Sequence, residues 1–306
     1  MRRVLLLFVD GVGLGEDDPS INPVAAAKTP FLDVLLGRKL AGIDGRIERN
    51  GAVLIPTDAT LGVDGLPQSA TGQTALLTGI NAAQAAGRHV TAYPTVGLKD
   101  LLTRHSIFRQ VKDLGGSVAL ANAYTPEYFG AVAEGRLRHA AITFSALAAG
   151  VPLRSLDDLR EGRAVFHDLT NARPRAWGHD VPAITPEDAG RNLTRIAGGY
   201  HLSVFEFFLT DLAAHRRVPH EPVAVVEMLD ALICGVVTSA GLEGLLIVMT
   251  SDHGNLEDGR AQTHTRNPVP TLLIGRGRDV VGQTIDTLTD ITPAIVRWLS
   301  EGRSDG

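Results

Sequence analysis

The feature that most constrains this chain is a series of short apolar runs that each stop abruptly in polar residues. The clearest run, at 245–249, has five large apolar residues without alternation, which predicts a parallel strand covered on both faces. Helical patterns separate it from similar runs at residues 3–9, 52–56, 117–121, 201–209 and 271–274. The alternation predicts an α/β fold with a doubly wound, mostly parallel central sheet and helices on both faces.

Helix signals lie between these runs. Pro30 after Thr29 predicts a helix start with Thr29 as N-cap, and Thr185 followed by Pro186 predicts another that ends near residue 196. Further helices are predicted over 103–114, 221–239 and 291–299.

The length of 306 residues allows one large α/β domain with an insertion, or two domains. We expect a single core over 1–306 with a small inserted cap at about 124–182, where the alternation of strands and helices becomes unclear. This stretch is rich in arginine and histidine. It is either a cap whose cations hold a substrate anion or a solvated surface insertion.

Composition excludes several classes of partner. The formal charge of −5 is not that of a nucleic-acid-binding protein. The apolar run that follows Arg2 and Arg3 is too short for a signal peptide, and no run approaches the ~20 residues that span a bilayer, so we expect no membrane contact. Cys234 is the only cysteine, which favours a reducing, cytoplasmic location.

Polar side chains with metal-ligand chemistry follow three of the predicted strands. Asp10 follows the first strand, and Asp252 and His253 follow the strand at 245–249. Asp211 and His215 follow the strand at 201–209 with i, i+4 spacing, so one helical turn brings both to one face. His264 comes eleven residues after His253. The glycines after Asp10 are not followed directly by a helix, so they do not fit a dinucleotide-binding turn.

Ser69 lies just before a helical pattern, in the stretch Gln-Ser-Ala-Thr-Gly. A hydroxyl residue at this place is usually an N-cap, and Ser69 or Thr71 could be one. Alternatively, Ser69 is a nucleophile beside a helix N-terminus whose backbone amides stabilise an anion.

These side chains are expected to converge, because the carboxyl ends of parallel strands meet at one edge of a sheet. Mixed nitrogen and oxygen ligands suit Zn²⁺ or Mn²⁺. Two such ions about 4 Å apart would clamp the attacking and leaving oxygens of a phosphoryl or sulfuryl group. The predicted site therefore consists of Asp10, Ser69, Asp211, His215, Asp252, His253 and His264.

The motifs that carry these residues resemble those of the alkaline phosphatase superfamily, and within it the branch of cofactor-independent phosphoglycerate mutase and phosphopentomutase. The similarity covers roughly residues 1–80 and 185–275. It rests on Asp-Gly at 10–11, Gln-Ser-Ala-Thr-Gly at 68–72, Asp-Leu-Ala-Ala-His at 211–215, Ser-Asp-His-Gly-Asn at 251–255 and His-Thr-Arg-Asn-Pro-Val-Pro at 264–270.

The resemblance implies a division of labour among these residues. Asp10, Ser69, Asp252 and His253 would hold one divalent ion, and the second would be held by Asp211, His215 and His264. Ser69 would accept the phosphoryl group of a small phosphorylated or sulfated substrate. Thr71 fits that role less well, because its place relative to Gly72 does not match the family pattern.

Two departures from the mutase pattern speak against phosphoglycerate mutase activity, whereas the ligand pattern is intact. The full-length mutases have a large inserted domain followed by a catalytic lysine, but this chain has no lysine after Lys112. Gln73 stands where the mutases have histidine. The prediction is a phosphomonoester hydrolase that forms a phosphoserine intermediate. The alternatives are a phosphomutase with a reduced cap, a phosphodiesterase or sulfatase, and a non-catalytic metal-binding module.

Overall fold

The computed structural model describes residues 2–302, in which seven strands form one sheet in the order β2-β3-β7-β6-β1-β5-β4. The four neighbours β6, β1, β5 and β4 are mutually parallel, whereas β7 and β2 run antiparallel to the strands beside them. The strands are β1 (Arg3–Val9), β2 (Ile47–Arg49), β3 (Ala52–Thr57), β4 (Val118–Leu120), β5 (Leu202–Phe207), β6 (Leu245–Thr250) and β7 (Val269–Gly275).

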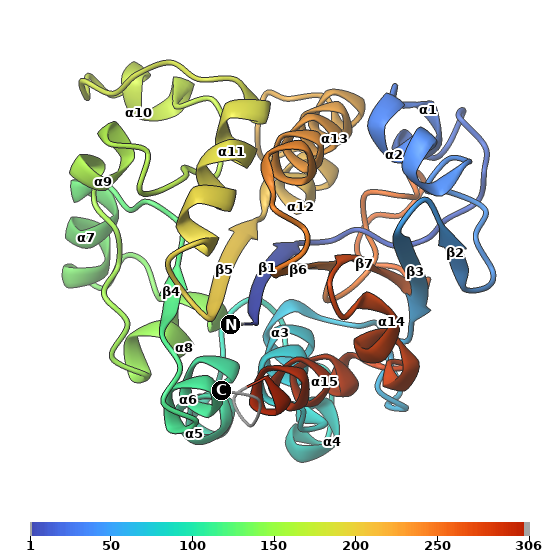
Figure 1. Ribbon diagram of the computed structural model, residues 1–306, viewed down its shortest axis with the longest axis horizontal. Helices are drawn as coiled ribbons and strands as arrows, with labels where there is room; N and C mark the ends of the chain where they lie inside the picture. The colour runs from blue at the N-terminus through green and yellow to red at the C-terminus, as the bar shows by residue number, and fades with distance from the viewer. Residues whose placement is uncertain (1, 303–306) are drawn as a thin grey trace.

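Helices cover both faces of this sheet, which confirms the predicted fold class (Figure 1). One face carries α3 (Ser69–Thr78), α4 (Ala82–Ala86), α5 (Val96–His105), α6 (Ile107–Asp113), α8 (Ala141–Ala148), α14 (Arg278–Val281), the 3₁₀-helix η1 (Gly282–Thr284) and α15 (Leu288–Glu301). The other carries α1 (Pro23–Ala26), α2 (Pro30–Leu36), α11 (Pro186–Ala197), α12 (Leu209–Ala214) and α13 (Pro222–Ser239).

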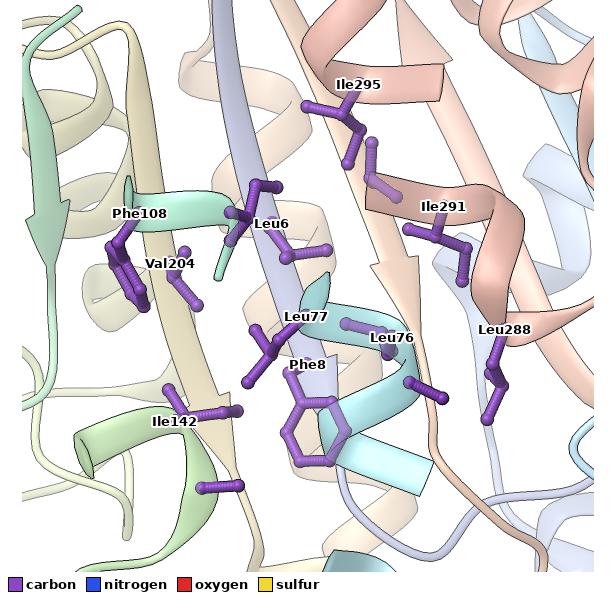
Figure 2. Packing of buried hydrophobic residues seen from close by; sticks show 14 of the residues in the cluster. Leu6, Phe8, Leu76, Leu77, Phe108, Ile142, Val204, Leu288, Ile291 and Ile295 are labelled. Atoms are coloured by element: carbon purple, nitrogen blue, oxygen red, sulfur yellow. The ribbon is translucent and has the colours of Figure 1, made fainter. Parts of the chain in front are cut away.

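Strand β1 shows why the sheet needs helices on both sides. Leu6 and Phe8 point toward Leu76 and Leu77 of α3 (Figure 2), whereas Leu5 belongs to the core under α11 and α13. All of these side chains are buried. Truncation of such a leucine to alanine typically costs about 2–5 kcal/mol, so the site is built on a rigid centre.

Most predicted elements are present, with corrections at their ends. The single helix predicted over 103–114 is wrong, because the extended backbone of Ser106 separates α5 from α6. The strand predicted to reach residue 209 ends at Phe207, where α12 follows almost at once. The last helix begins at Leu288 instead of residue 291, since Thr287 and Asp290 form a capping box at its start.

The N-terminus of α2 is capped differently from the prediction. Thr29 occupies the N-cap position, but its side chain does not accept a bond from the helix. The backbone amides of Phe31 and Leu32 instead donate to the carboxylate of Asp230 on α13 (3.2 and 2.8 Å). A residue 200 positions away thus caps the helix, which no local pattern could reveal.

Residues 124–182 extend the molecule past the edge strand β4. Besides α8, three helices lie there, α7 (Pro126–Ala133), α9 (Leu156–Arg160) and α10 (Ala172–Ala176), and a small separate hydrophobic cluster includes Leu159 of α9 and Phe166. Helix α8 differs from them, because it packs with α5 and α3 against the main sheet.

Helix α13 is long and apolar enough to be a candidate membrane span by length and composition. It packs closely against α11, where a Cβ atom on Gly190 would meet the backbone of α13, and one on Gly235 would meet the backbone at Glu187. Eight of its residues, among them Val225 and Leu229, are buried. These contacts make α13 part of the protein core.

Candidate metal centre

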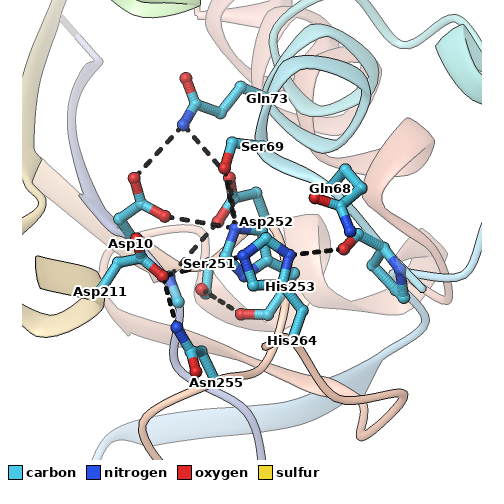
Figure 3. Close-up of polar contacts among 12 residues, drawn as sticks. Asp10, Gln68, Ser69, Gln73, Asp211, Ser251, Asp252, His253, Asn255 and His264 are labelled. Carbon is cyan, nitrogen blue, oxygen red and sulfur yellow. Dashed lines mark hydrogen bonds and ion pairs between the residues drawn. The ribbon is translucent and has the colours of Figure 1, made fainter. Parts of the chain in front are cut away.

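All seven residues of the predicted site lie at the carboxyl edge of β6, β1 and β5. Asp10 follows β1, Asp252 and His253 follow β6, and α12 carries Asp211 and ends at His215. Ser69 is the first residue of α3, and His264 lies on the loop that leads into β7. Figure 3 shows most of these side chains pointing toward one another. Five of them form two overlapping groups, and within each group the ligand atoms lie within 4.8 Å of one another: Asp10, Asp252 and His253, and Asp211, His253 and His264.

The inner cluster, defined as Asp10, Ser69, Asp252 and His253, is almost closed to solvent. The side chains of Asp252 and His253 are 0% exposed, and that of Asp10 is 12% exposed. His253 Nε2 lies 3.0 Å from Ser69 Oγ, 3.5 Å from Asp10 Oδ1 and 3.6 Å from Asp252 Oδ2. These distances leave room for a cation among the four ligand atoms.

The outer cluster, defined as Asp211, His215 and His264, is more open. Its side chains are 15%, 19% and 9% exposed. Asp211 Oδ1 lies 3.5 Å from His215 Nε2 and 4.0 Å from His264 Nε2. The ring centroids of His253 and His264 are only 3.6 Å apart, so the two clusters are in direct contact.

Backbone carbonyls orient two of the imidazole rings. His264 Nδ1 lies 2.7 Å from the carbonyl oxygen of Pro67, and His253 Nδ1 lies 3.4 Å from that of Gly254. A carbonyl only accepts, so each Nδ1 carries the proton and each Nε2 keeps a free lone pair. Both Nε2 atoms face the carboxylates, which is the tautomer that a metal ligand requires.

Ser69 is placed differently from the other hydroxyl of its segment. It occupies the first position of α3, with Gln68 as the N-cap residue, so it is not itself the cap. Its hydroxyl lies among the ligands, near the positive end of the helix dipole. Thr71 is fully buried, and its hydroxyl donates to the carbonyl of Gln68 and accepts from the amide of Val90 (both 3.2 Å).

The electrostatics of the site favour the binding of positive charge there. Burial, followed by repulsion from Asp252 and Asp211, raises the pKa of Asp10 well above its ordinary value. Burial and then Asp211 raise the pKa of Asp252 to about 7, and burial and then Asp252 raise that of Glu206 to about 8. Burial and then His264 lower the pKa of His253. Within residues 2–302, the ion-pair contacts of Asp10, Asp211 and Asp252 are with histidine alone.

This donor set fits divalent cations. Asp10 Oδ1 is buried and has no hydrogen-bond partner, although a buried carboxylate oxygen normally has one. Neutral imidazoles and crowded carboxylates with vacant lone pairs are the ligands that Zn²⁺ and Mn²⁺ take. Bound cations would offset the repulsion that raises the carboxyl pKa values.

The sequence analysis assigned no supporting role to three residues that hold the ligands in place. Gln73 donates from Nε2 to Asp252 Oδ2 (3.2 Å) and Asp10 Oδ2 (3.5 Å), and Asn255 donates to Asp211 Oδ1 (2.7 Å). Glu257 is buried and accepts from the backbone amides of Gly13 and Asn255 (both 2.8 Å) and from the hydroxyl of Thr265. Glu257 thus ties together the loops after β1 and β6 and the loop with His264. The sequence signals were the place of Gln73 in the family pattern and the nearness of Asn255 and Glu257 to His253.

Glycines allow the loops to approach so closely. Gly11 has a positive φ of 67°, and a Cβ atom there would lie 2.7 Å from Asp211 Oδ1. A Cβ atom on Gly72 would lie 2.7 Å from the carbonyl oxygen of Asp252. Both positions therefore need glycine for steric reasons.

A cavity of about 1020 Å³ opens directly from the metal centre toward residues 124–182. Asp10, Ser69, Asp211, His215 and His264 form part of its wall. The ends of β5 and β4 and helix α7 contribute much of the rest. A substrate held in this cavity would reach both ligand clusters.

Comparison with known proteins agrees with this class of fold and site. The model of a family described as the Metalloenzyme superfamily matches residues 189–300, which include Asp211, His215, Asp252, His253 and His264. The resemblance to the alkaline phosphatase superfamily expected from the motifs is confirmed: the Metalloenzyme superfamily model matches part of the chain, and an alkaline phosphatase shares its fold.

The more particular resemblance is to 2,3-bisphosphoglycerate-independent phosphoglycerate mutases. That of Syntrophotalea carbinolica is 35% identical over 126 residues, which cover 39% of this chain and 24% of that protein. One from Prochlorococcus marinus is 31% identical over 149 residues, which cover 43% of this chain and 28% of that protein. The chain thus spans about a quarter of the length of these relatives.

Solved structures agree over the whole chain. The PH0037 protein from Pyrococcus horikoshii has a TM-score of 0.60 at 16% identity, with 98% of this chain and 97% of that chain covered. Alkaline phosphatase from the Antarctic bacterium TAB5 has a TM-score of 0.50 at 12% identity, with 98% of each chain covered. At such identities these likenesses show the fold alone.

Proposed function

We propose that this chain is a dinuclear metal-dependent phosphomonoester hydrolase in which Ser69 accepts the phosphoryl group. The observation that carries the proposal is the position of Ser69. Its hydroxyl lies 3.0 Å from Nε2 of His253, the one residue that belongs to both groups of ligands, and it lines the cavity. A site that only stabilised the fold would need no hydroxyl group at that point.

In this proposal the site residues would have separate roles in metal binding and phosphoryl transfer. Asp10, Ser69, Asp252 and His253 would hold one divalent ion and Asp211, His215 and His264 the other, in line with the family resemblance. Bound ions would lower the pKa of the serine hydroxyl and neutralise the phosphate oxygens. The dipole at the N-terminus of α3 would add to the stabilisation of negative charge near Ser69.

The reaction balances in two steps. Ser69 Oγ forms a bond to phosphorus while the bond from phosphorus to the substrate oxygen breaks, and the serine proton leaves with the released alcohol. Water then attacks the phosphoserine, which returns the serine hydroxyl and releases inorganic phosphate.

A phosphomutase is the second candidate, because the curated relatives are named as phosphoglycerate mutases. In that case the phosphoserine would pass its phosphoryl group back to the substrate. The absence of lysine after Lys112 and the presence of Gln73 favour hydrolysis. Formation of an isomeric phosphate ester without release of inorganic phosphate would favour the phosphomutase over the hydrolase.

The test combines metal analysis with phosphate release from a panel of monoesters, diesters and sulfate esters under added Mn²⁺ or Zn²⁺. We expect two metal ions per chain, preference for monoesters, and a loss of about 10³-fold or more in kcat for Ser69→Ala with metal retained. Thr71→Val is the matched control, since it removes the other hydroxyl of the segment, and it should keep most activity. Turnover that survives Ser69→Ala but not Thr71→Val would contradict the proposal.

A further inference from the structure

The cavity beside the metal centre is much larger than a three-carbon phosphate requires. Its volume of about 1020 Å³ is at the upper end of the range of about 300–1,000 Å³ typical of pockets for drug-sized ligands. The organic part of the substrate therefore has substantial space beyond the phosphoryl group.

Aromatic side chains are concentrated in the wall of this cavity. The chain has only 15 aromatic residues (9 Phe, 4 Tyr and 2 Trp), yet six of them line this one cavity. They are Tyr93, Tyr124, Tyr128, Phe166, Trp177 and Phe208. Three of the four tyrosines are thus gathered here, although none of them was needed for the metal chemistry.

The aromatic wall is continuous with the metal centre. Phe208 follows β5 and lies three residues before Asp211, and its ring stacks on that of His167 with centroids 4.5 Å apart. Tyr124 follows β4, the strand next to β5, and its ring centroid is 4.8 Å from that of Tyr128. The ends of β5 and β4 thus bring aromatic rings to the wall of the same cavity that the metal ligands line.

The cavity wall also has arginine side chains that form no ion pair with a carboxylate in the described residues. Arg138 lies over the Tyr93 ring at 4.5 Å and Arg173 over the Trp177 ring at 5.0 Å. In the described part of the chain, no carboxylate forms an ion pair with Arg138, Arg173 or Arg217, all of which line the cavity. Such a wall favours an anionic ligand with a planar group over a neutral apolar one.

We propose that the substrate is a phosphate monoester whose organic group carries a planar ring, and that Phe208 is a specificity-determining residue that stacks with this ring. The inference rests on the proposed phosphoryl-transfer function and adds the class of substrate. A nucleoside monophosphate and an aryl-substituted alkyl phosphate share this chemistry, so the test includes both.

The experiment compares pairs of esters that have the same kind of leaving alcohol with and without a planar ring. Adenosine 5′-monophosphate is paired with ribose 5-phosphate, and benzyl phosphate with cyclohexylmethyl phosphate. Stacking of one base on an aromatic side chain typically increases affinity by about fivefold to 100-fold, so we expect kcat/KM to favour the ring-bearing member by about tenfold in at least one pair. The pair with the larger ratio identifies the source of the ring.

Phe208→Leu should bring the ratio of kcat/KM between the ring-bearing ester and its ring-free partner close to one. The matched control is Phe144→Leu, the same substitution of a half-buried ring outside the cavity wall, which should keep the ratio. Because each ratio compares two substrates of one variant, a general loss of activity cancels. Equal kcat/KM within both pairs, or a ratio that survives Phe208→Leu, would overturn the inference and leave the hydrolase proposal intact.

A second measurement separates this inference from the function on which it rests. Calorimetric titration of Mn²⁺-loaded Ser69→Ala protein with each of the four esters reports affinity without turnover. Tighter binding of a ring-bearing ester would support the inference even if the unsubstituted chain cleaved no ester. Equal affinities within both pairs would contradict it, whatever the activity.

Discussion

The two halves of the metal centre differ in how the fold holds them. The inner cluster combines residues that follow β1 and β6 with Ser69 of α3; its Asp252 and His253 side chains are 0% exposed and that of Asp10 is 12% exposed. The outer cluster comes from the short helix α12 and the loop before β7, and its side chains are 9–19% exposed in the cavity wall. Burial holds the inner ligands in place in the metal-free protein, whereas solvent and substrate can reach the outer ligands. We therefore expect the inner cluster to bind its ion more tightly.

The largest effects on kcat/KM and metal content should come from two single variants, each of which removes one metal ligand of one cluster. Asp252→Asn should lower kcat/KM by about 10³-fold or more and the metal content to about one ion per chain, because the lost charge is fully buried. His215→Asn should cost about 10–100-fold and recover in excess metal, since that site is open. Steady-state kinetics and elemental analysis check both variants.

Asp258→Asn provides the control, because Asp258 lies on the same loop as Asp252 but pairs with the exposed Arg260. Asp258→Asn should leave kcat/KM and metal content near those of the unsubstituted protein. Equal losses for Asp252→Asn and His215→Asn, with equal recovery in excess metal, would contradict the difference between the clusters.

A second, smaller effect concerns stability in the absence of metal. Burial and the charge of Asp252 raise the pKa of Glu206 to about 8, so between about pH 4.5 and 8 the folded metal-free chain binds a proton there that the unfolded chain has lost. Because the unfolded state binds fewer protons, this group lowers the free energy of unfolding as pH rises across that interval. Glu206→Gln should therefore stabilise the metal-free protein by a few kcal/mol near pH 7.5 and hardly at all near pH 4.5.

Urea unfolding of chelator-treated protein at the two pH values measures this effect. Glu187→Gln, at an exposed carboxylate on α11, is the control and should give no such pH-dependent difference. A gain in stability that is the same at both pH values would mean that the titration of Glu206 is not the cause.

The sequence predicted the convergence of the ligands better than the means by which they are held. Asp10, Asp211 and Asp252 each follow an apolar run, and parallel strands bring their carboxyl ends to one edge. The role of Glu257 was not predictable, because it depends on amides from the separate loops at Gly13 and Asn255. Sequence separation hides such contacts.

The same limit explains why no substrate-binding residue could be predicted. The cavity wall combines the end of β5 with residues from the 124–182 stretch, where the alternation of strands and helices gave no clear pattern. The cap over 124–182 remains a proposal, supported by the small separate hydrophobic cluster under α9 and by the cavity residues that this stretch supplies. A local pattern identifies the chemistry of a strand end, but a wall assembled from distant loops has no local signature.

The smallest expected effect comes from a substitution that leaves every metal ligand in place. It therefore tests the difference between the two clusters most specifically. Asn255 Nδ2 donates to Asp211 Oδ1 at 2.7 Å, so Asn255→Ala should free the orientation of one outer ligand and weaken outer-site metal binding by about tenfold. Asn267→Ala is the matched control, since Asn267 donates to Glu257 at 3.0 Å and reaches no ligand. Competition with a metal-binding dye reports the two affinities separately. If Asn255→Ala weakened metal binding at both sites equally, or if Asn267→Ala weakened it as much as Asn255→Ala, the outer cluster would depend on the loop as a whole. A selective loss would show that one side-chain amide compensates for the exposure of the outer site.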